Sequence, residues 1–471
     1  MLCFSQKQSI AMASLLFSFF FFLLAFSAYA GSIGINYGRV ANDLPPPSKV
    51  VELLKSIGIT RVKLYDTNAD VLTALANSGI SAVVALPNEL LSSAAADQSF
   101  TDQWVQSNIS PHLPATQFEA IAVGNEVFVD PNNTTRFLVP AMKNVHASLT
   151  KLNLDGKIKI SSPIALSALQ SSYPPSSGSF KTDLTEPVIK PMLDFLRQTG
   201  SYLMVNAYPF FAYEANTDTV SLDYALFKPN AGVVDSGNGL RYASLLEAQL
   251  DAVYAAMSAL KYDDVQVVVS ETGWPSKGDS NEVGASADNA ATYNGNLVQR
   301  VLTGGGTPLR QKDPLSVYLF ALFNENQKSG PTSERNYGLF YPNEQKVYDI
   351  SLTLTNESTT VTNVSKSQTP AASPSSRGGG QTWCVANGGS AAEKLQAALD
   401  YACGEGGADC GPIQPGATCY NPNSLEAHAS YAFNSYYQKK SRGAGTCYFG
   451  GTAFVVTQPP KFGNCEYPTG Y

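Results

Sequence analysis

Short apolar runs alternate with longer amphipathic segments from residue 32 to about residue 350. Residues 48–58, "SKVVELLKSIG", carry apolar side chains at helical spacing, and similar segments separate other apolar runs. The pattern predicts strands at residues 32–38, 61–66, 81–87, 118–127, 157–164, 202–211, 265–274 and 316–325. Eight strands alternating with helices over such a length fit a (β/α)8 barrel, the TIM-barrel form of the α/β class.

An open doubly wound sheet is the alternative architecture for this alternation. That fold commonly carries G-x-G-x-x-G directly after a strand, and no predicted strand here is followed by such a motif. Residues 303–308, "TGGGTP", lack the Lys-Ser/Thr pair of a phosphate-binding loop and are interpreted as a turn. The barrel is therefore the favoured prediction.

Residues 1–30 have the layout of a secretory signal peptide. A short leader containing Lys7 precedes the apolar run 15–26, which is too short to span a bilayer comfortably, and "AYA" at 28–30 supplies small residues for cleavage. No other stretch is apolar enough to span a membrane, and the C-terminal residues form no hydrophobic tail for a lipid anchor. We expect a secreted, extracellular, monomeric protein without a membrane anchor.

The composition changes after residue 352. Residues 353–381 are rich in Ser, Thr, Pro and Gly, which predicts a linker between a barrel at 31–352 and a separate module at 382–471. The six cysteines of this module are Cys384, Cys403, Cys410, Cys419, Cys447 and Cys465. An even number in a short exported segment indicates three disulfides, with fifteen pairings left open. A metal site is disfavoured because no pair has C-x-x-C spacing.

Charge and aromatic content narrow the class of ligand. The formal net charge is −7 and the sequence contains no basic run, which argues against nucleic acid and anionic membranes as partners. Charged residues make up only 15%, whereas aromatic residues make up 11% and include 24 tyrosines. Weakly charged, tyrosine-rich surfaces suit neutral polyhydroxy ligands, whose C–H faces pack on rings while their hydroxyls form hydrogen bonds. No metal and no cofactor is expected.

Carboxylates stand at the ends of two predicted strands that lie far apart in the sequence. Strand 118–127 ends in "GNEV", which carries Glu126, and strand 265–274 ends in "SETGW", which carries Glu271. TIM-barrel enzymes build their sites at the C-terminal ends of strands, so the two side chains are expected to face each other across the barrel mouth. Either glutamate alone would more often be a salt-bridged strand cap. Together they favour acid/base chemistry on a glycosidic bond.

Such chemistry requires two carboxyl groups in different protonation states. One is protonated and donates to the leaving oxygen, while the other is ionised and attacks the anomeric carbon or activates water. Two like charges close together push the two pKa values apart, which supplies both states at one pH. A separation of about 5 Å gives retention of configuration and about 6.5–9.5 Å gives inversion. The sequence leaves that distance open.

Other side chains at strand ends are candidates for substrate contact. Glu325 and Lys328 follow the last strand, where the lysine is expected to set the charge state of the pair rather than to form a surface ion pair. The aromatic residues Tyr37 and Tyr208 stand near the ends of two more strands, and Trp274 ends the strand that carries Glu271. Each of them either contacts sugar or belongs to the core.

Several motifs carry a resemblance to a known family. The barrel contains "GINYGR", "VGNEV", "NAYPFFAY", "SETGWPS", "NENQK" and "ERNYGLF". With these motifs it resembles the plant glucan endo-1,3-β-glucosidases of glycoside hydrolase family 17. The module contains "WCVAN", "GADCGPIQPGATCYNP" and "GNCEYP" and resembles carbohydrate-binding module family 43. Together the two resemblances cover nearly the whole chain after residue 30.

The resemblance implies a retaining mechanism, with Glu126 as acid/base, Glu271 as nucleophile and Asn125 holding the sugar 2-hydroxyl. Further residues that match the family's charged cluster or groove are Glu325, Lys328, Glu334, Tyr37, Tyr208 and Phe340. The implied disulfides, within a small and mainly helical carbohydrate-binding domain, are Cys384–Cys447, Cys403–Cys410 and Cys419–Cys465. The implied activity is endohydrolysis of 1,3-β-glucosidic linkages, with β-1,3-glucan as the partner of both domains. The expected location is extracellular, in association with the cell wall.

Two other functions remain open at this point. A β-1,3-glucan transglycosylase would use the same residues, because a sugar instead of water can intercept a retaining intermediate. A non-catalytic, glucan-binding protein of the cell wall would be expected to have lost a glutamate or a cluster residue, and none is missing.

Overall fold

The computed structural model describes residues 31–354, most of 382–440 and parts of the remaining C-terminal segment. In detail, the described residues are 31–354, 382–386, 392–404, 406–440, 442, 446–447, 449, 452–456, 460 and 465–469. The predicted signal peptide and nearly all of the predicted linker lie outside these residues. The chain divides into two compact units, residues 1–357 and 358–471, and each is described by itself.

The first unit contains a ring of parallel strands. In ring order the strands are β5 (Lys159–Ser161), β4 (Gln117–Val123), β3 (Ser81–Leu86), β2 (Arg61–Lys63), β1 (Ser32–Asn36), β13 (Ser316–Leu319), β12 (Val267–Thr272), β9 (Leu203–Asn206) and β6 (Pro163–Ala165). Every neighbouring pair is parallel. The fifth predicted strand is divided at Ser162: β5 pairs with β4, and β6 pairs with β9. The two ends of the sheet therefore meet at one residue, which confirms the (β/α)8 barrel.

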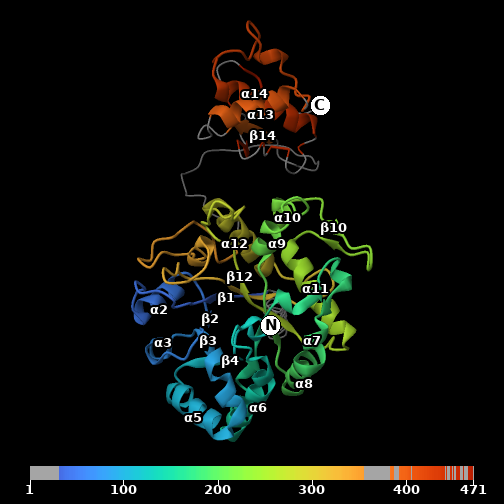
Figure 1. Cartoon of the computed structure of the whole chain (residues 1–471). Coiled ribbons are helices and arrows are strands. Elements are labelled where there is room, and N and C mark those ends of the chain that lie inside the picture. Colours follow the sequence, from blue (N-terminus) through green and yellow to red (C-terminus); the bar gives the residue numbers. More distant parts are fainter. Residues whose placement is uncertain are drawn as a thin grey trace, which may run out of the picture. The chain divides into compact units, whose positions relative to one another are not determined.

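Helices surround the strands (Figure 1). They are α2 (Pro47–Ser56), α3 (Ala69–Ala74), α4 (Leu91–Ala96), α5 (Gln98–Asn108), α6 (Leu138–Lys151), α7 (Thr182–Leu184), α8 (Lys190–Thr199), α9 (Pro209–Glu214), α10 (Leu222–Ala225), α11 (Leu245–Ala259) and α12 (Ala287–Leu302). Their starts follow local chemistry: Ser244 and Ser286 cap α11 and α12, and Pro47 opens α2. Short pairs β7 (Leu169–Ser171) with β8 (Ser179–Phe180) and β10 (Val233–Val234) with β11 (Arg241–Tyr242) lie in the connections.

Alternation along the strands separates the barrel interior from the layer beneath the helices. Val84 belongs to the large core cluster, while its neighbours Val83 and Ala85 belong to a smaller cluster with Tyr318. Near the strand starts, the Arg61 guanidinium lies 4.6 Å from the Tyr318 ring centroid and makes two hydrogen bonds to Glu119. An ion pair therefore lies near the N-terminal ends of the strands, at the opposite end from the C-terminal ends, where TIM-barrel enzymes build their sites.

The second unit is a small disulfide-bonded domain. Strand β14 (Trp383–Ala386) pairs antiparallel with β15 (Ala453–Val456), beside helices α13 (Ala392–Cys403) and α14 (Leu425–Lys439). The disulfides are Cys384–Cys447, Cys403–Cys410 and Cys419–Cys465, which are the pairs that the resemblance implies. Among the described residues of the chain, no helix is long and apolar enough to cross a membrane.

Candidate active site

A cleft of about 680 Å³ lies where the strands of the barrel end. Its lining comes from residues near the ends of β6, β9 and β12, from residues that follow β1, β2, β4, β6, β9 and β13, and from one residue of α11, so most of the ring contributes. Glu126 and Glu271 both line it, as the strand-end argument predicts. Asn125, Tyr208, Glu325 and Lys328 line it as well.

Glu271 is the fifth residue of β12 and is only 6% exposed. Its Oε1 lies 2.8 Å from Lys63 Nζ, and its Oε2 accepts a hydrogen bond of 2.8 Å from the Tyr208 hydroxyl. Burial alone would raise the pKa of this carboxyl group, but the Lys63 charge and hydrogen bonds from Lys63, Tyr65 and Tyr208 outweigh it and lower the pKa. The side chain is therefore held as a carboxylate.

Glu126 follows β4 in a turn with left-handed backbone, φ being +70° at Gly124 and +50° at Glu126. A non-glycine residue pays a steric cost there, so the turn has to be held from outside. Asn88 does this: its Oδ1 accepts from the Asn125 amide at 2.8 Å, and its Nδ2 donates to the Asn125 carbonyl at 3.0 Å. The turn aims the Glu126 side chain into the cleft that Glu271 lines.

The pKa of Glu126 moves in the opposite direction from that of Glu271. Burial and the negative charge of Glu271 raise the pKa of Glu126, and a hydrogen bond from Asn206 opposes them. Asn206 Nδ2 donates to Glu126 Oε1 at 2.9 Å, while its Oδ1 accepts from Ser270 Oγ at 2.7 Å. One cleft thus holds a carboxyl group biased toward its protonated form beside a carboxylate, the combination that glycosidic bond cleavage requires.

A cluster of three charged residues, Glu325, Lys328 and Glu334, also lines this cleft. Lys328 Nζ is 4.0 Å from Glu325 Oε2 and 3.6 Å from Glu334 Oε2, and it lies over the Phe320 ring at 4.2 Å from the centroid. Burial raises the pKa of Glu325, although Lys328 and a hydrogen bond of 2.8 Å from the Val40 amide act against it. The three residues Glu325, Lys328 and Glu334, which the motifs grouped, therefore come together in the cleft that Glu271 lines.

Comparison with known proteins agrees with this arrangement. Residues 33–352 match the family model of glycosyl hydrolases family 17. The chain belongs to family 17 of the glycosyl hydrolases. Residues 382–454 match the model of the X8 domain, so this family 17 member carries a second recognised domain. The resemblance drawn from the motifs is confirmed.

Relatives of this family 17 hydrolase are similar over nearly its whole length. It is 44% identical over 458 residues to Glucan endo-1,3-beta-glucosidase 7 of Arabidopsis thaliana, covering 96% of this chain and 88% of that protein. Identity to the glucan endo-1,3-beta-D-glucosidase of Olea europaea is 40% over 468 residues, 99% and 100% of the two chains. A solved structure of a β-1,3-glucanase and allergen of Cryptomeria japonica pollen is 42% identical, with a TM-score of 0.66 over 69% of this chain and 100% of that chain.

Three aromatic candidates for sugar contact or for support of the site, Tyr37, Trp274 and Phe340, do not line the cleft. Trp274 is fully buried and donates from Nε1 to the Gly284 carbonyl at 2.9 Å, with its ring packed on neighbouring aromatic side chains. Tyr37 is 3% exposed and packs edge-on against Phe323, and Phe340 is 5% exposed. All three belong to the large core cluster of the barrel. The sequence could not show this, because a position near a strand end does not decide whether a side chain points into the cleft or into the core.

Other residues of the site were missed from the sequence. Lys63 and Tyr65 surround Glu271, Asn206 binds Glu126, and Phe320 and Tyr337 add aromatic surface to the cleft. A signal existed for the first: "RVKLYD" places a lysine between two apolar residues within a predicted strand, where a cation needs a buried partner. The polar Asn206 at a strand end was a similar, weaker signal.

Proposed function

We propose that this family 17 hydrolase cleaves internal linkages of β-1,3-glucan with retention of configuration. The observation that carries the proposal is the opposite displacement of two pKa values in one cleft, raised for Glu126 and lowered for Glu271. Relatives named as glucan endo-1,3-β-glucosidases support the choice of linkage and of an endo mode of cleavage.

In this mechanism Glu271 is the nucleophile and Glu126 is the acid/base. The Glu271 carboxylate attacks the anomeric carbon while Glu126 passes its proton to the leaving glycosidic oxygen, giving a covalent glycosyl-enzyme. Glu126, now ionised, takes a proton from water as the water attacks the anomeric carbon and releases Glu271. Tyr208 and Lys63 hold the two oxygens of Glu271 in place for the attack. Asn125, which lines the cleft next to Glu126, is proposed to hold the 2-hydroxyl.

The X8 domain is proposed to bind the same polymer and to keep the barrel near its substrate. A tethered binding domain raises the effective concentration of the catalytic domain at a polymer surface without any new contact in the cleft. Export to an extracellular compartment belongs to the same proposal, because three disulfides form and persist in oxidising surroundings.

The experiment is product analysis on linear β-1,3-glucan, following the anomeric configuration by proton NMR. Wild type should release short oligosaccharides that appear first as β-anomers. Glu271→Gly should be inactive, and added azide should restore turnover and give the α-glycosyl azide, which assigns the nucleophile. Early α-anomers would exclude retention. A wild-type protein that binds the glucan but releases no product would overturn the catalytic proposal.

A further inference from the structure

Gln249 is a buried amide that faces the cleft without a partner for its oxygen. It begins the second turn of α11, is 8% exposed and lines the same cleft as the two glutamates. Its Oε1 accepts no hydrogen bond from any residue that the structure describes. Buried side-chain oxygens are nearly always paired in folded proteins, so an unpaired one that borders a binding cleft points to a ligand that donates to it.

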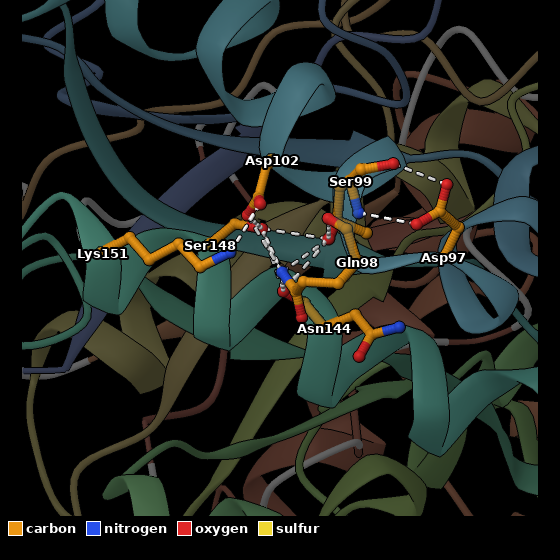
Figure 2. A network of polar contacts seen from close by, with 8 residues as sticks. Asp97, Gln98, Ser99, Asp102, Asn144, Ser148 and Lys151 are labelled. Carbon is orange, nitrogen blue, oxygen red and sulfur yellow. Dashed lines mark hydrogen bonds and ion pairs between the residues drawn. The ribbon is translucent and has the colours of Figure 1, made fainter.

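Gln98 shows how this chain pairs a glutamine that serves the fold alone. Its Nε2 lies 3.0 Å from Asp102 Oδ1, 2.9 Å from Ser148 Oγ and 3.0 Å from the Asn144 carbonyl, between α5 and α6 (Figure 2). Gln98 does not line the cleft. The amide nitrogen of Gln98 is thus bonded within the fold, whereas the amide oxygen of Gln249 has no partner among the described residues and borders the cleft.

The surroundings of Gln249 indicate what it would bind. Helix α9, which carries Phe211 and Ala212, packs against α11, and both of these residues line the cleft. Phe211 is 41% exposed, and the centroid of its ring lies 5.6 Å from that of Tyr208, whose hydroxyl donates to Glu271. An exposed ring beside one buried amide suits a pyranose unit, whose C–H face packs on the ring while a hydroxyl donates to Oε1.

We propose that Gln249 and Phe211 form a binding subsite for a glucose unit of the chain outside the cleaved bond. The inference rests on the proposed function for the identity of the sugar. The subsite acts on binding of longer chains and does not take part in bond cleavage. Its consequence is a preference for substrates long enough to reach it.

The first test compares kcat/KM on β-1,3-linked gluco-oligosaccharides of three to six units. Gln249→Leu should lower kcat/KM by about fivefold to tenfold on the oligosaccharides that reach the subsite and leave the shorter ones unchanged, the size expected for one hydrogen bond between uncharged groups. Gln98→Leu is the matched control and should keep the wild-type dependence on chain length. Equal kcat/KM for Gln249→Leu and wild type at every length would overturn the proposal.

Thermal unfolding without substrate separates a binding role from a structural one. Removing an unpaired buried amide should leave the Tm of Gln249→Leu equal to or above that of wild type, whereas Gln98→Leu, which breaks a paired network, should lower it. A lowered Tm for Gln249→Leu, with Gln249→Ala agreeing, would mark the amide as structural and count against the subsite.

A binding measurement keeps this proposal distinct from the proposed activity. In a Glu271→Gln background, the six-unit oligosaccharide should bind about fivefold to tenfold more weakly when Gln249 is also replaced by Leu. If wild type cleaves β-1,3-glucan while this double variant binds as tightly as Glu271→Gln, the subsite is wrong and the activity stands. If wild type cleaves nothing but the difference in binding is found, the activity is wrong and the subsite stands.

Discussion

Lys63 Nζ lies 2.8 Å from Glu271 Oε1, although 208 positions separate the two residues in the sequence. The Lys63 side chain is 1% exposed, and its ammonium also lies over the Tyr65 ring at 4.0 Å from the centroid. A buried carboxylate is costly unless it is paired, and a buried ammonium equally so. The attraction between the two charges therefore offsets the cost of burying each of them in the cleft.

Replacing Lys63 by Met should move the acid limb of the pH profile of kcat/KM to higher pH. Without the ammonium, burial dominates and raises the pKa of Glu271, so the nucleophile protonates at a higher pH than in wild type. Activity in wild type is kept as pH falls until the lowered pKa of Glu271 is reached. The measurement is kcat/KM against pH, with Lys63→Arg as the control that keeps the charge.

The same substitution should destabilise the barrel by roughly 3–5 kcal/mol at neutral pH, since it leaves a buried carboxylate without its cation. The pKa of Glu271 is lower in the folded state than in the unfolded state. The stabilisation by the Lys63–Glu271 pair is therefore present above the pKa of Glu271 in the unfolded chain, and it is lost as the pH falls through the pKa of Glu271 in the folded protein. A folded Lys63→Met variant with the wild-type acid limb would show that the ammonium does not set the charge of Glu271.

Asn206 should set the other limb of the profile. Its hydrogen bond favours the ionised form of Glu126, so Asn206→Ala should raise the pKa of Glu126 further and move the basic limb to higher pH. At the optimum, kcat should fall by about 10-fold to 100-fold, because Glu126 becomes a carboxylate as it gives up its proton and the hydrogen bond that stabilises this charged form is lost. Ser270→Ala is the control: it removes the bond to Asn206 Oδ1 and leaves the one to Glu126. An Asn206→Ala variant with the basic limb of wild type would contradict this role.

The barrel and its two glutamates could be predicted from the sequence because both depend on local patterns. Alternating apolar runs define the strands, and the parallel ring then brings all strand ends, with Glu126 and Glu271, to one face. The division of the fifth strand at Ser162 could not be predicted, since it depends on pairing with β4 on one side and β9 on the other.

Other features of the site depend on the register between strands and on which side chains point into the barrel, and a single sequence shows neither. The pairing of Lys63 with Glu271 requires that two strands on different sides of the ring point these side chains into one interior. Trp274, only three residues after Glu271, turns instead into the aromatic layer beneath the helices. Gln249 comes from a helix, so a search confined to strand ends passes over it.

The ion pair at the opposite end of the barrel should be a stability element without a role in catalysis. Arg61 binds Glu119 through two nitrogens, at 2.9 and 2.6 Å, and the side chains are 16% and 21% exposed. Glu119→Gln should lower the free energy of unfolding by about 2–4 kcal/mol, less than for a fully buried pair because water reaches both groups. The kcat on β-1,3-glucan should stay within twofold of wild type, since neither residue lines the cleft.

The pH dependence of unfolding tests whether the charge of Glu119 carries this stabilisation. Burial would raise the pKa of Glu119, but hydrogen bonds and charge from Arg61, with hydrogen bonds from Tyr318 and Tyr202, lower it. The contribution is therefore present above the pKa of an unfolded glutamate and disappears as pH falls through the lowered folded value, so wild type and Glu119→Gln should converge in acid. Urea unfolding from neutral to acidic pH measures this, with Tyr318→Phe as a control that removes one hydrogen bond and keeps both charges. A difference between wild type and Glu119→Gln that stays constant down to strongly acidic pH would show that the charge of Glu119 does not carry the stabilisation.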